Sequence, residues 1–591
     1  MAATTHSPRM RAEVATVEHQ DQLCVTPLDA ADKMALIHAL RTVAGTVRFD
    51  SGGVCIPASR ASLLLGVENL DLRWTEAALR FAENRSRVQA THGTVRVQVE
   101  AIKAGGPEHA RSLLRDLDDI DKLDGHQLVN VAAMTVPGSP GLCVFDEQGA
   151  GKTVTLIFAF DLLVKRQEAD LIVVVAPKSM IAEWPKDLAR FKGDLYRVAV
   201  ITGSRREKVQ ALRSAPDFIV TNFETAVAME AELTALLRAR DGRGVLTVDE
   251  SFYAKNLDAA RTRTLRRLRE WCRRAYVLCG TPAPNTPQDL VQQFNLVDFG
   301  LTFADVQVPK EREAATPVVQ HAIGARGLYV RHLKQDVLPD LPGKTFQRIL
   351  CPLQPHQQRL YQSALQSLII DVRATDDATF NRQLASFLAR RMALLQICSH
   401  PGMVAEGYDE VPAKQLALDA LLEELIGRRG EKVVLWSYFR QSLEQLADRY
   451  SRYGVIRYDG SVTDVNERRE GVRRFQEDDD TRLFIANPAA AGAGLTLHRS
   501  RIAIYESFSN QAAHYLQSLD RIHRRGQERE VEYLMLLGDG TIEQTEYETL
   551  LRKERSAQEL LGDHVEPAPT RQSMLTELLF AAHQANIEVA P

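Results

Sequence analysis

The chain has 591 residues, 45% of them hydrophobic and 25% charged, a balance typical of folded globular proteins rather than fibrous or disordered ones. Its 73 Lys and Arg against 77 Asp and Glu give a formal net charge of −4, which excludes a polycation that coats nucleic acid. Any nucleic-acid surface is therefore expected to be a local basic patch. The length corresponds to roughly three to four domains.

The seven cysteines are scattered without a CxxC pair, which argues against zinc binding and against a disulfide framework. The first residues lack the apolar segment of a signal peptide, and no apolar run is long enough for a membrane span. We therefore expect a protein of a reducing compartment, cytoplasmic or nucleoid-associated, that is not secreted and has no membrane partner.

In chain order, residues 1–115 come first and differ in texture from the rest. Alternating residues favour strands at 46–50 and 94–100, and a helix is expected around Trp74–Asn84. We predict a small N-terminal accessory domain of unknown role here, through which a protein partner could bind.

Two sets of apolar, β-branched runs follow, and longer amphipathic stretches separate the runs. Such strands are typical of parallel sheets covered on both faces, so two α/β domains are expected. The region between the sets, 286–425, favours helices, and its proline-marked segment 338–344 is expected to be a joint between units. The expected strands are 171–177, 218–223, 245–250 and 275–281 in the first set, and 432–438, 482–488, 502–507 and 531–537 in the second.

The segment 141–158 has the pattern of a phosphate loop: an apolar strand, a Gly-containing turn and a helix. Gly149 and Gly151 allow backbone amides to turn toward an anion, Lys152 supplies a positive charge for the β- and γ-phosphates, and Thr153 supplies a hydroxyl for Mg²⁺. Asp146 stands where the strict pattern has Gly, so the match is to the variant DExGxGKT.

A second motif places two carboxylates, Asp249 and Glu250, at the end of an apolar strand. Asp249 is suited to hold Mg²⁺, and Glu250 to orient or deprotonate the attacking water. Together with the phosphate loop, this pair predicts ATP and Mg²⁺ as cofactors.

Two arginine-rich segments have more than one interpretation. On a helix, Arg521 and Arg524 would share one face, where they could reach the γ-phosphate from a separate domain or form a solvated basic helix end. The seven arginines of 261–274 surround an apolar stripe, so this helix could face a duplex or simply be solvated. Trp184 favours a core position over a base-stacking role.

Taken in order, the motifs from about Leu123 to Leu561 resemble those of the Swi/Snf-type (Snf family) ATPases of helicase superfamily two. The resembling segments are LDGHQ (123–127), DEQGAGKT (146–153), APKSMIAEWPKDLARF (176–191), IVTNFET (219–225), VDESFYAKN (248–256), LCGTPAPN (278–285), YVRHLKQDVLPDLPGK (329–344), LQICSHP (395–401), KVVLWSYF (432–439), YDGSVTDVNERREGVRRFQ (458–476), AAGAGLTL (490–497) and DRIHRRGQ (520–527).

The resemblance implies an α/β fold of two RecA-like parallel-sheet lobes with helical insertions, preceded by the small N-terminal domain. The implied division is 1–115 for the accessory domain, 116–300 for the first lobe, 301–425 for the helical insertion and lobe linker, 426–560 for the second, helicase C-terminal lobe, and 561–591 for a C-terminal tail.

The resemblance also implies roles for individual residues. The catalytic residues are Lys152, Asp249, Glu250, Arg521 and Arg524, with Thr153 and Asp249 at the metal. ATP binding is assigned to Gln127 as the adenine contact and to Asp146, Glu147, Gly149, Gly151, Lys152 and Thr153. Nucleic-acid contacts are assigned to Pro177, Thr221, Gly280, Thr281, Asn285, Ser437, Gly460 and Ser461.

Two positions depart from the family pattern. Motif II usually carries His where this chain has Phe252, and that His helps to relay between the ATP site and the nucleic acid. Motif V has Thr496 where Asn is common, which indicates a divergent branch. The departure at Phe252 bears on coupling rather than on hydrolysis itself.

The expected function is that of a DNA-stimulated ATPase that translocates on double-stranded DNA and remodels DNA or protein–DNA complexes. Two alternatives remain open: a helicase that separates or anneals DNA or RNA strands, and an ATP-gated nucleic-acid-binding scaffold whose motor is uncoupled.

Overall fold

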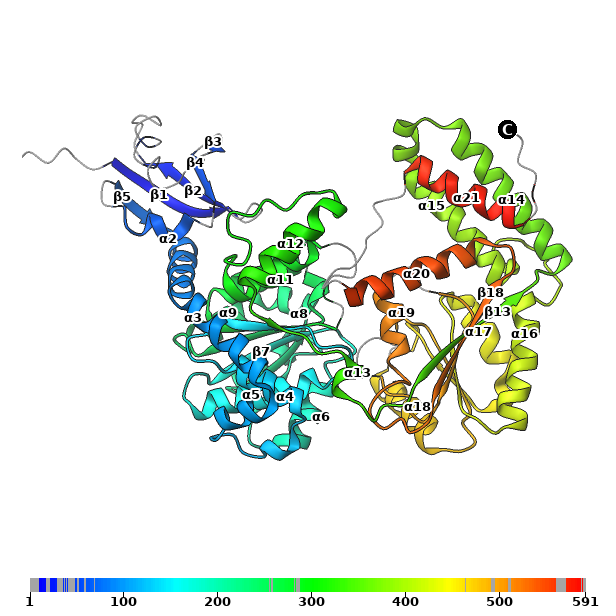
Figure 1. Ribbon diagram of the computed structural model, residues 1–591, viewed down its shortest axis with the longest axis horizontal. Helices are drawn as coiled ribbons and strands as arrows, with labels where there is room; N and C mark the ends of the chain where they lie inside the picture. The colour runs from blue at the N-terminus through cyan, green and yellow to red at the C-terminus, as the bar shows by residue number, and fades with distance from the viewer. Residues whose placement is uncertain are drawn as a thin grey trace, which may run out of the picture. The chain divides into compact units, whose positions relative to one another are not determined.

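The chain forms two compact units in the computed structural model, Met1–Val337 and Leu338–Pro591 (Figure 1). The division falls at the start of segment 338–344, where the sequence predicts a joint. Among the described residues, none of the helices combines the length and the apolar character needed to cross a bilayer. The structure describes residues 10–17, 22–28, 36, 38, 40, 48–49, 53–57, 60–67, 70–254, 256, 259–280, 282, 287–462, 464–490, 495–508, 512–559, 570–585 and 587.

The first unit begins with a small five-stranded sheet. Its elements are β1 (Met10–Val17), β2 (Gln22–Pro27), β3 (Arg48–Phe49), β4 (Val54–Pro57), helix α2 (Ala61–Leu64) and β5 (Leu70–Trp74). The strand order is β3-β4-β2-β1-β5, and β1 pairs antiparallel with β2 and parallel with β5. Ala12, Val14, Leu23 and Val25 alternate along β1 and β2 and form the core of this sheet.

Helix α3 (Glu76–Leu113) contributes to two cores of the first unit. Ala78 near its start packs with the small sheet, whereas Val95 and Val99 pack with the large α/β core. Segment 94–100 therefore lies in a helix, and the expected strand is wrong. Its alternation was misleading because Val95 and Val99 are also spaced i, i+4, while Val97 between them is 68% exposed.

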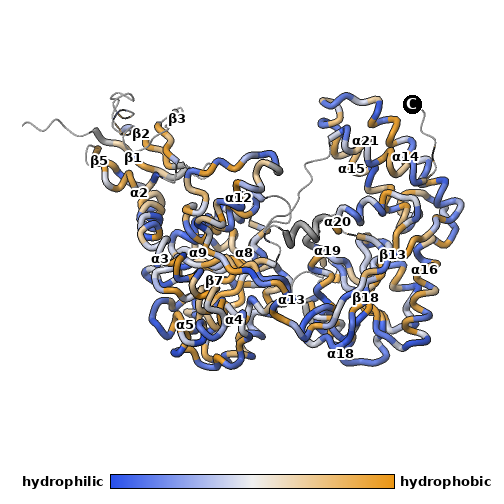
Figure 2. The backbone as a smooth tube through the Cα atoms, viewed as in Figure 1, coloured by the Kyte–Doolittle hydropathy of each residue, from blue (hydrophilic) through white to orange (hydrophobic). Residues whose placement is uncertain are grey.

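The large sheet of the first unit is entirely parallel. Its strands are β6 (Gly141–Val144), β7 (Leu171–Ala176), β8 (Val198–Val200), β9 (Phe218–Asn222), β10 (Gly244–Asp249), β11 (Cys272–Leu278) and β12 (Tyr329–Val330). They lie in the order β12-β6-β11-β10-β7-β9-β8. β7 consists of hydrophobic residues only, and all of them are buried (Figure 2). This is the pattern expected of a sheet covered on both faces.

Helices connect these strands. They are η2 (Ile120–Lys122), α4 (Gly125–Met134), α5 (Lys152–Lys165), α6 (Glu183–Lys192), α7 (Arg205–Arg213), α8 (Phe223–Ala228), α9 (Glu230–Arg238), η3 (Ser251–Ala254), α10 (Ala260–Arg269), α11 (Asp289–Asp298), α12 (Arg312–Arg326) and α13 (Lys334–Val337).

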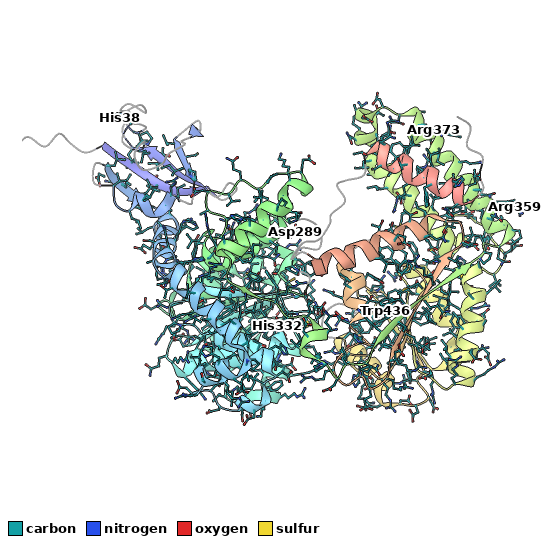
Figure 3. The ribbon with its side chains drawn as sticks, viewed as in Figure 1. His38, Asp289, His332, Arg359, Arg373 and Trp436 are labelled. Atoms are coloured by element: carbon teal, nitrogen blue, oxygen red, sulfur yellow. The ribbon has the colours of Figure 1, made fainter. Side chains whose placement is uncertain are left out.

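The second unit is built on a six-stranded parallel sheet. Its strands are β13 (Lys344–Cys351), β14 (Val433–Trp436), β15 (Val455–Tyr458), β16 (Leu483–Ala486), β17 (Ile502–Tyr505) and β18 (Val531–Gly538), in the order β13-β18-β17-β14-β16-β15. Trp436 on β14 is fully buried in the core of this sheet (Figure 3). The two parallel sheets confirm the expected α/β class and its two lobes.

Helices flank this sheet, and α14, α15 and α21 pack on one another around Leu365, Phe387 and Leu578 (Figure 1). The helices of the second unit are α14 (Pro355–Ala374), α15 (Asp377–Ser399), η4 (Pro401–Met403), α16 (Ala413–Leu422), η5 (Glu423–Arg428), α17 (Arg440–Arg449), η6 (Ser451–Tyr453), α18 (Val465–Glu477), α19 (Ala512–Leu519), α20 (Ile542–Glu559) and α21 (Arg571–Gln584).

The described part of region 286–425 is mostly helical, as expected, but it also supplies an edge strand to each parallel sheet. β12 pairs with β6 in the first unit, and β13 pairs with β18 along its whole length in the second. The search for apolar runs did not find β13, because β13 is an edge strand whose first five residues are exposed. The remaining domain boundaries stay a prediction.

Candidate nucleotide site and arginine segment

The phosphate loop joins β6 to α5 at the carboxyl edge of the first unit's parallel sheet. Gly149 and Gly151 have φ of 85° and 82°, a left-handed conformation that glycine adopts without strain. A side chain at Gly151 would also collide with the carboxamide of Gln127. The turn directs the chain into α5 at Lys152, so the unpaired amides of the first helical turn face the loop. This geometry suits a bound phosphate.

Lys152 is nearly buried and folds back over the loop that precedes it. Its Nζ donates to the carbonyl oxygens of Asp146 at 2.8 Å and Glu147 at 3.1 Å. These contacts hold a positive charge at the base of the phosphate loop, beside the half-buried Thr153. The predicted pair of a phosphate-binding ammonium group and a metal-binding hydroxyl is therefore brought together.

Gln127 connects the start of α4 to the phosphate loop. Its Oε1 accepts from the backbone amide of Asp124 at 2.9 Å, and its Nε2 donates to the carbonyl oxygen of Gly151 at 3.4 Å. The neighbouring ring of His126 lies 2.8 Å, through Nε2, from the carbonyl oxygen of Ala150. Adenine binding by Gln127 stays a prediction, and the structure adds that this residue also supports the loop.

The carboxylates of Asp146 and Glu147, which are expected to bind ATP, contact protein partners in this structure, and their role in ATP binding stays a prediction. Asp146 is fully buried; its Oδ2 accepts from Asn130 at 2.5 Å, and its Oδ1 lies 2.9 Å from Nδ1 of His332 (Figure 3). Glu147 Oε2 accepts from the backbone amide of Lys334 at 2.6 Å. The two carboxylates therefore fasten segment 332–334 to the phosphate loop, where direct contact with a polyphosphate would be repulsive.

Asp249 ends β10, and β10 and β6 both pair with β11. Its carboxylate is buried: Oδ2 accepts from the indole Nε1 of Trp184 at 3.2 Å, and Oδ1 accepts from the amide of Glu250 at 3.0 Å. Burial, reinforced by the charge of Glu250, raises the pKa of Asp249 to about 7, although the charge of Lys152 opposes the shift. Trp184 is fully buried, as expected.

Glu250 follows Asp249 with a φ of 49°, an unusual conformation for a residue with a side chain. The Nε2 of Gln148 in the phosphate loop donates to its Oε1 at 2.5 Å. This contact joins the phosphate loop to the expected water-activating carboxylate. A strained backbone conformation such as that of Glu250 is typical of functional sites.

The residues at this edge fit Mg²⁺ by their chemistry. Thr153 and Asp249 offer hard oxygen ligands, and Mg²⁺ in nucleotide sites binds one or two such side chains together with phosphates and waters. The raised pKa of Asp249 indicates a buried carboxyl group that lacks sufficient positive charge nearby, which a divalent cation would provide.

Phe252 occupies the position of the missing motif II histidine. It is largely buried, and its ring stacks on that of Tyr253 with centroids 4.5 Å apart. The preceding residue, Ser251, instead makes the polar contact: its Oγ donates to Oε1 of Gln293 at 2.5 Å. Nothing in the sequence singles out Gln293, because α11 (DLVQQFNLVD) carries several polar residues, among them a second glutamine beside it.

The arginine-rich segment 261–274 is not the single helix that was expected, because α10 ends at Arg269, and Arg273 and Arg274 lie in β11. Arg269 is fully buried and donates to the backbone carbonyls of Leu296 at 2.6 Å and Val297 at 2.8 Å, at the end of α11. Arg274 is also buried and pairs with Glu168, and Arg267 pairs with Glu230. Arg269 and Arg274 are buried, so for these two neither DNA binding nor a solvated helix face holds. Arg267 is half-buried and pairs with a half-buried carboxylate.

The predicted nucleic-acid contacts differ in exposure. In the first unit Pro177 is half-buried at the end of β7, whereas Thr221 and Gly280 are buried. In the second unit Gly460 is exposed and Ser461 is half-buried, but Ser437 is fully buried and donates to Oε2 of Glu506 at 2.8 Å. The hydroxyls of Thr221 and Ser437 therefore do not face solvent here. Thr281 and Asn285 lie outside the described residues.

Arg521 and Arg524 were expected on a helix face, but α19 ends at Leu519 and both lie in the turns that follow. They nevertheless converge, because Nη1 of each donates to the carbonyl oxygen of Leu495, at 3.3 Å and 3.2 Å. Gln527 fixes this turn through Nε2, which donates to the carbonyl oxygen of Ser500 at 2.9 Å. The sequence prediction failed because the spacing i, i+3 fits turns as well as helices.

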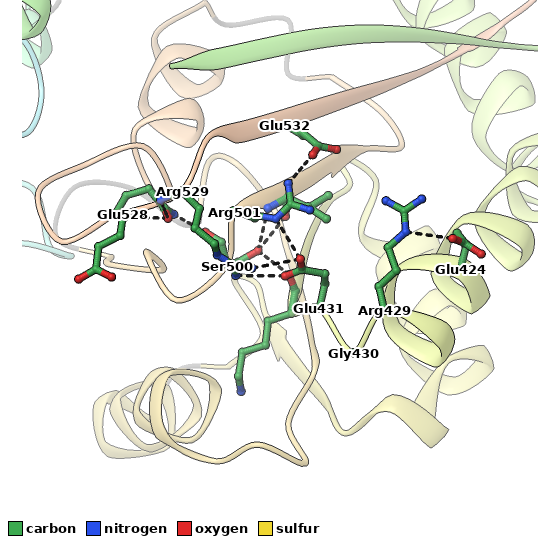
Figure 4. Close-up of polar contacts among 12 residues, drawn as sticks. Glu424, Arg429, Gly430, Glu431, Ser500, Arg501, Glu528, Arg529 and Glu532 are labelled. Carbon is green, nitrogen blue, oxygen red and sulfur yellow. Dashed lines mark hydrogen bonds and ion pairs between the residues drawn. The ribbon is translucent and has the colours of Figure 1, made fainter. Parts of the chain in front are cut away.

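A charged cluster lies next to the turn that holds Arg521 and Arg524. Glu431 accepts from Nε of Arg501 at 2.9 Å and from Nη2 of Arg529 at 3.1 Å, and Arg501 also pairs with Glu532 (Figure 4). These residues stand where β14, β17 and β18 begin. The cluster therefore connects the turn after α19 to three neighbouring strands.

Two family models match the chain: the SNF2-related domain at residues 124–403 and the helicase conserved C-terminal domain at residues 416–526. The DNA repair and recombination protein RAD54-like of Homo sapiens is 24% identical over 478 residues, covering 70% of this chain and 62% of that protein. The RAD54-like protein of Drosophila persimilis is 27% identical over 465 residues, covering 68% and 58%.

The ATP-dependent helicase fft2 of Schizosaccharomyces pombe is 26% identical over 488 residues, covering 68% of this chain and 38% of that protein. The chain thus spans less than two thirds of the length of these relatives. Among solved structures, the Sulfolobus solfataricus SWI2/SNF2 ATPase core in complex with dsDNA is 21% identical with a TM-score of 0.33, covering 79% of this chain and 97% of that one.

Proposed function

The chain belongs to the SNF2-related family of helicase-like ATPases, and from this premise we propose that it is an ATP-dependent translocase on double-stranded DNA. Its ATP hydrolysis would be stimulated by the duplex, and its action would remodel DNA or protein–DNA complexes. Strand separation is not part of the proposal.

The observation that carries the proposal is the convergence of three motifs at one edge of the first parallel sheet. The phosphate loop, the carboxylates of Asp249 and Glu250, and Gly280 follow the neighbouring strands β6, β10 and β11. In open α/β sheets this edge is where nucleotides bind. ATP hydrolysis needs a phosphate cradle, a metal-holding carboxylate and a base, and this edge holds candidates for all three.

The residues would divide the work as follows. The amides at the start of α5 and the ammonium group of Lys152 bind the β- and γ-phosphates, so Lys152 exchanges its loop carbonyls for phosphate oxygens. Glu250 accepts the proton of the attacking water. Mg²⁺, held by Thr153 and Asp249, would neutralise charge that develops on the phosphates. Arg521 and Arg524 keep their predicted role in stabilising the charge of the transition state.

Double-stranded DNA is the proposed partner because the RAD54-like relatives carry DNA repair and recombination in their names. Contacts to the phosphate backbone would give sequence-independent, salt-sensitive binding. Of the predicted contacts that the structure describes, Gly460, Ser461 and Pro177 are at least partly exposed for this purpose.

The test is steady-state ATP hydrolysis by the full chain without nucleic acid and with single-stranded DNA, duplex DNA or duplex RNA, with Lys152→Ala as the blank. We expect strong stimulation by duplex DNA that is lost in the variant, followed by displacement of a triplex-forming strand. Preference for single strands or RNA would favour a helicase instead. ATP binding without turnover on any substrate would indicate a scaffold.

A further inference from the structure

Gln293 on α11 connects the segment after β10 to the segment after β11. Its side chain is fully buried. Oε1 accepts from the hydroxyl of Ser251 at 2.5 Å, while Nε2 donates to the carbonyl oxygen of Pro282 and to that of Asp289 at 3.0 Å. The planar carboxamide of Gln293 thus binds Ser251, which follows β10, and Pro282, which follows β11.

The two ends of this bridge lie next to functional positions. Ser251 directly follows Glu250, the proposed base. Pro282 lies two residues beyond Gly280, which belongs to the segment predicted to contact nucleic acid. Phe252, at the position of the usual relay histidine, has an apolar ring stacked on Tyr253 and cannot make a polar link.

Burial makes the bridge responsive to movement. If the carbonyl of Pro282 shifts, the rigid carboxamide of Gln293 must follow or leave buried polar groups unpaired, which is costly. Because the carboxamide of Gln293 is planar, a rotation that moves its Nε2 also moves its Oε1, and the hydroxyl of Ser251 must move with Oε1. A change in the segment after β11 is therefore transmitted to the residue adjoining Glu250.

We propose that Gln293 is the positioning residue that couples DNA binding at the segment after β11 to Glu250, in place of the absent histidine. This inference rests on the proposed function, since it requires a DNA-stimulated ATPase. Coupling between two sites is reciprocal, so Gln293 also transmits the nucleotide state to DNA affinity.

The test compares Gln293→Leu with Gln292→Leu in the full chain. Gln292 is a matched control because it is the neighbouring buried glutamine on α11 and its Oε1 has no hydrogen-bond partner. We expect Gln293→Leu to lower the ratio of duplex-stimulated to basal ATP turnover by about tenfold, a typical coupling. Basal turnover and the KM for ATP should stay within about twofold of the parent, and Gln292→Leu should keep the full ratio.

Two further measurements separate coupling from packing. The ratio of duplex-DNA Kd values with and without a non-hydrolysable ATP analogue should approach one in Gln293→Leu. Ser251→Ala removes the other partner at smaller steric cost, and the double variant should lose no more coupling than Gln293→Leu alone.

Equal loss of basal and stimulated turnover, or an unchanged ratio in both Gln293→Leu and Ser251→Ala, would overturn the inference and leave Gln293 with a packing role only. Failure of the proposed function is recognised separately, because the parent protein itself would then show no stimulation by duplex DNA.

Discussion

The carboxamide of Gln148 donates a hydrogen bond of 2.5 Å to Oε1 of Glu250, so the phosphate loop orients the proposed base directly. Gly280 lies against the same glutamine: a Cβ built on Gly280 would stand 2.8 Å from Cγ of Gln148. Three motifs that are far apart in the sequence therefore meet at one side chain. A base that is held by a third group is a common arrangement in catalytic sites.

The first prediction concerns this hydrogen bond. Gln148→Met keeps the length of the side chain but removes the donor, so we expect kcat for ATP to fall about tenfold, part of what a positioned base contributes. ATP binding should be unchanged because phosphate contacts remain. Equilibrium binding of a non-hydrolysable ATP analogue and steady-state kinetics check this, with Gln98→Met on the exposed face of α3 as the control. A rise in KM at constant kcat would contradict the assignment.

The second prediction concerns pH. Because the pKa of Asp249 is raised to about 7, its carboxyl group holds a proton below that pH, and Mg²⁺ must displace it. We expect Mg²⁺ affinity to weaken by up to about tenfold per pH unit below pH 7 and to level off above it. Mg²⁺ titrations with a fluorescent ATP analogue between pH 6 and 8 measure this.

Asp249→Asn is the matched control, since any pH dependence that persists in it belongs to the nucleotide; equal slopes in both proteins would refute the assignment. The sign for stability follows from the same shift. The folded state retains a proton that the unfolded state loses near pH 4, so the metal-free protein becomes less stable as pH rises from about 4 to 7.

The third prediction concerns the contact between Asp146 and His332. His332→Ala leaves the fully buried Asp146 carboxylate with one partner fewer, so we expect a loss of about 1–3 kcal/mol in the free energy of unfolding. His321→Ala on the exposed face of α12 should change it by less than about 0.5 kcal/mol. Chemical denaturation measures both, and equal effects would show that Asp146 does not depend on the histidine.

The fourth prediction concerns Arg269. Arg269→Leu leaves the backbone carbonyls of Leu296, Val297, Cys272 and Pro140 without this donor, so we expect a destabilisation of about 3–5 kcal/mol. Arg273→Ala, which removes an exposed arginine of the same run, should leave thermal unfolding nearly unchanged. A stable Arg269→Leu protein with weakened DNA binding would instead restore the interpretation of this segment as a nucleic-acid surface.

Much of the nucleotide site could be predicted because local chemistry determines it. The pattern of Gly149, Gly151 and Lys152 predicts a phosphate loop, since an anion-binding loop needs small residues and a nearby cation. Apolar runs located the buried central strands, for example β7 and β10, because their burial on both faces leaves few polar positions.

The rest depends on contacts between distant segments. His332 and Lys334, which contact Asp146 and Glu147, lie almost 190 residues further along the chain, so the sequence could not distinguish an ATP contact from a structural one. Val95 and Val99 fit both a strand and a helix until α4 and the large core supply neighbours for them. Likewise, an arginine run does not reveal which guanidinium groups end up beneath a helix terminus.

The pairing of β13 with β18 also has a consequence for synthesis. Lys344 aligns with Val531, so the first strand of the second unit pairs with the last strand of the same sheet. A ribosome must therefore synthesise almost two hundred further residues before β13 finds its neighbour, and until then the backbone amides and carbonyls of β13 have no partner strand. Such long-range closure slows folding. The nascent second unit should accordingly need protection from aggregation until β18 has emerged, whereas the large sheet of the first unit already has all its strands once residue 330 is available.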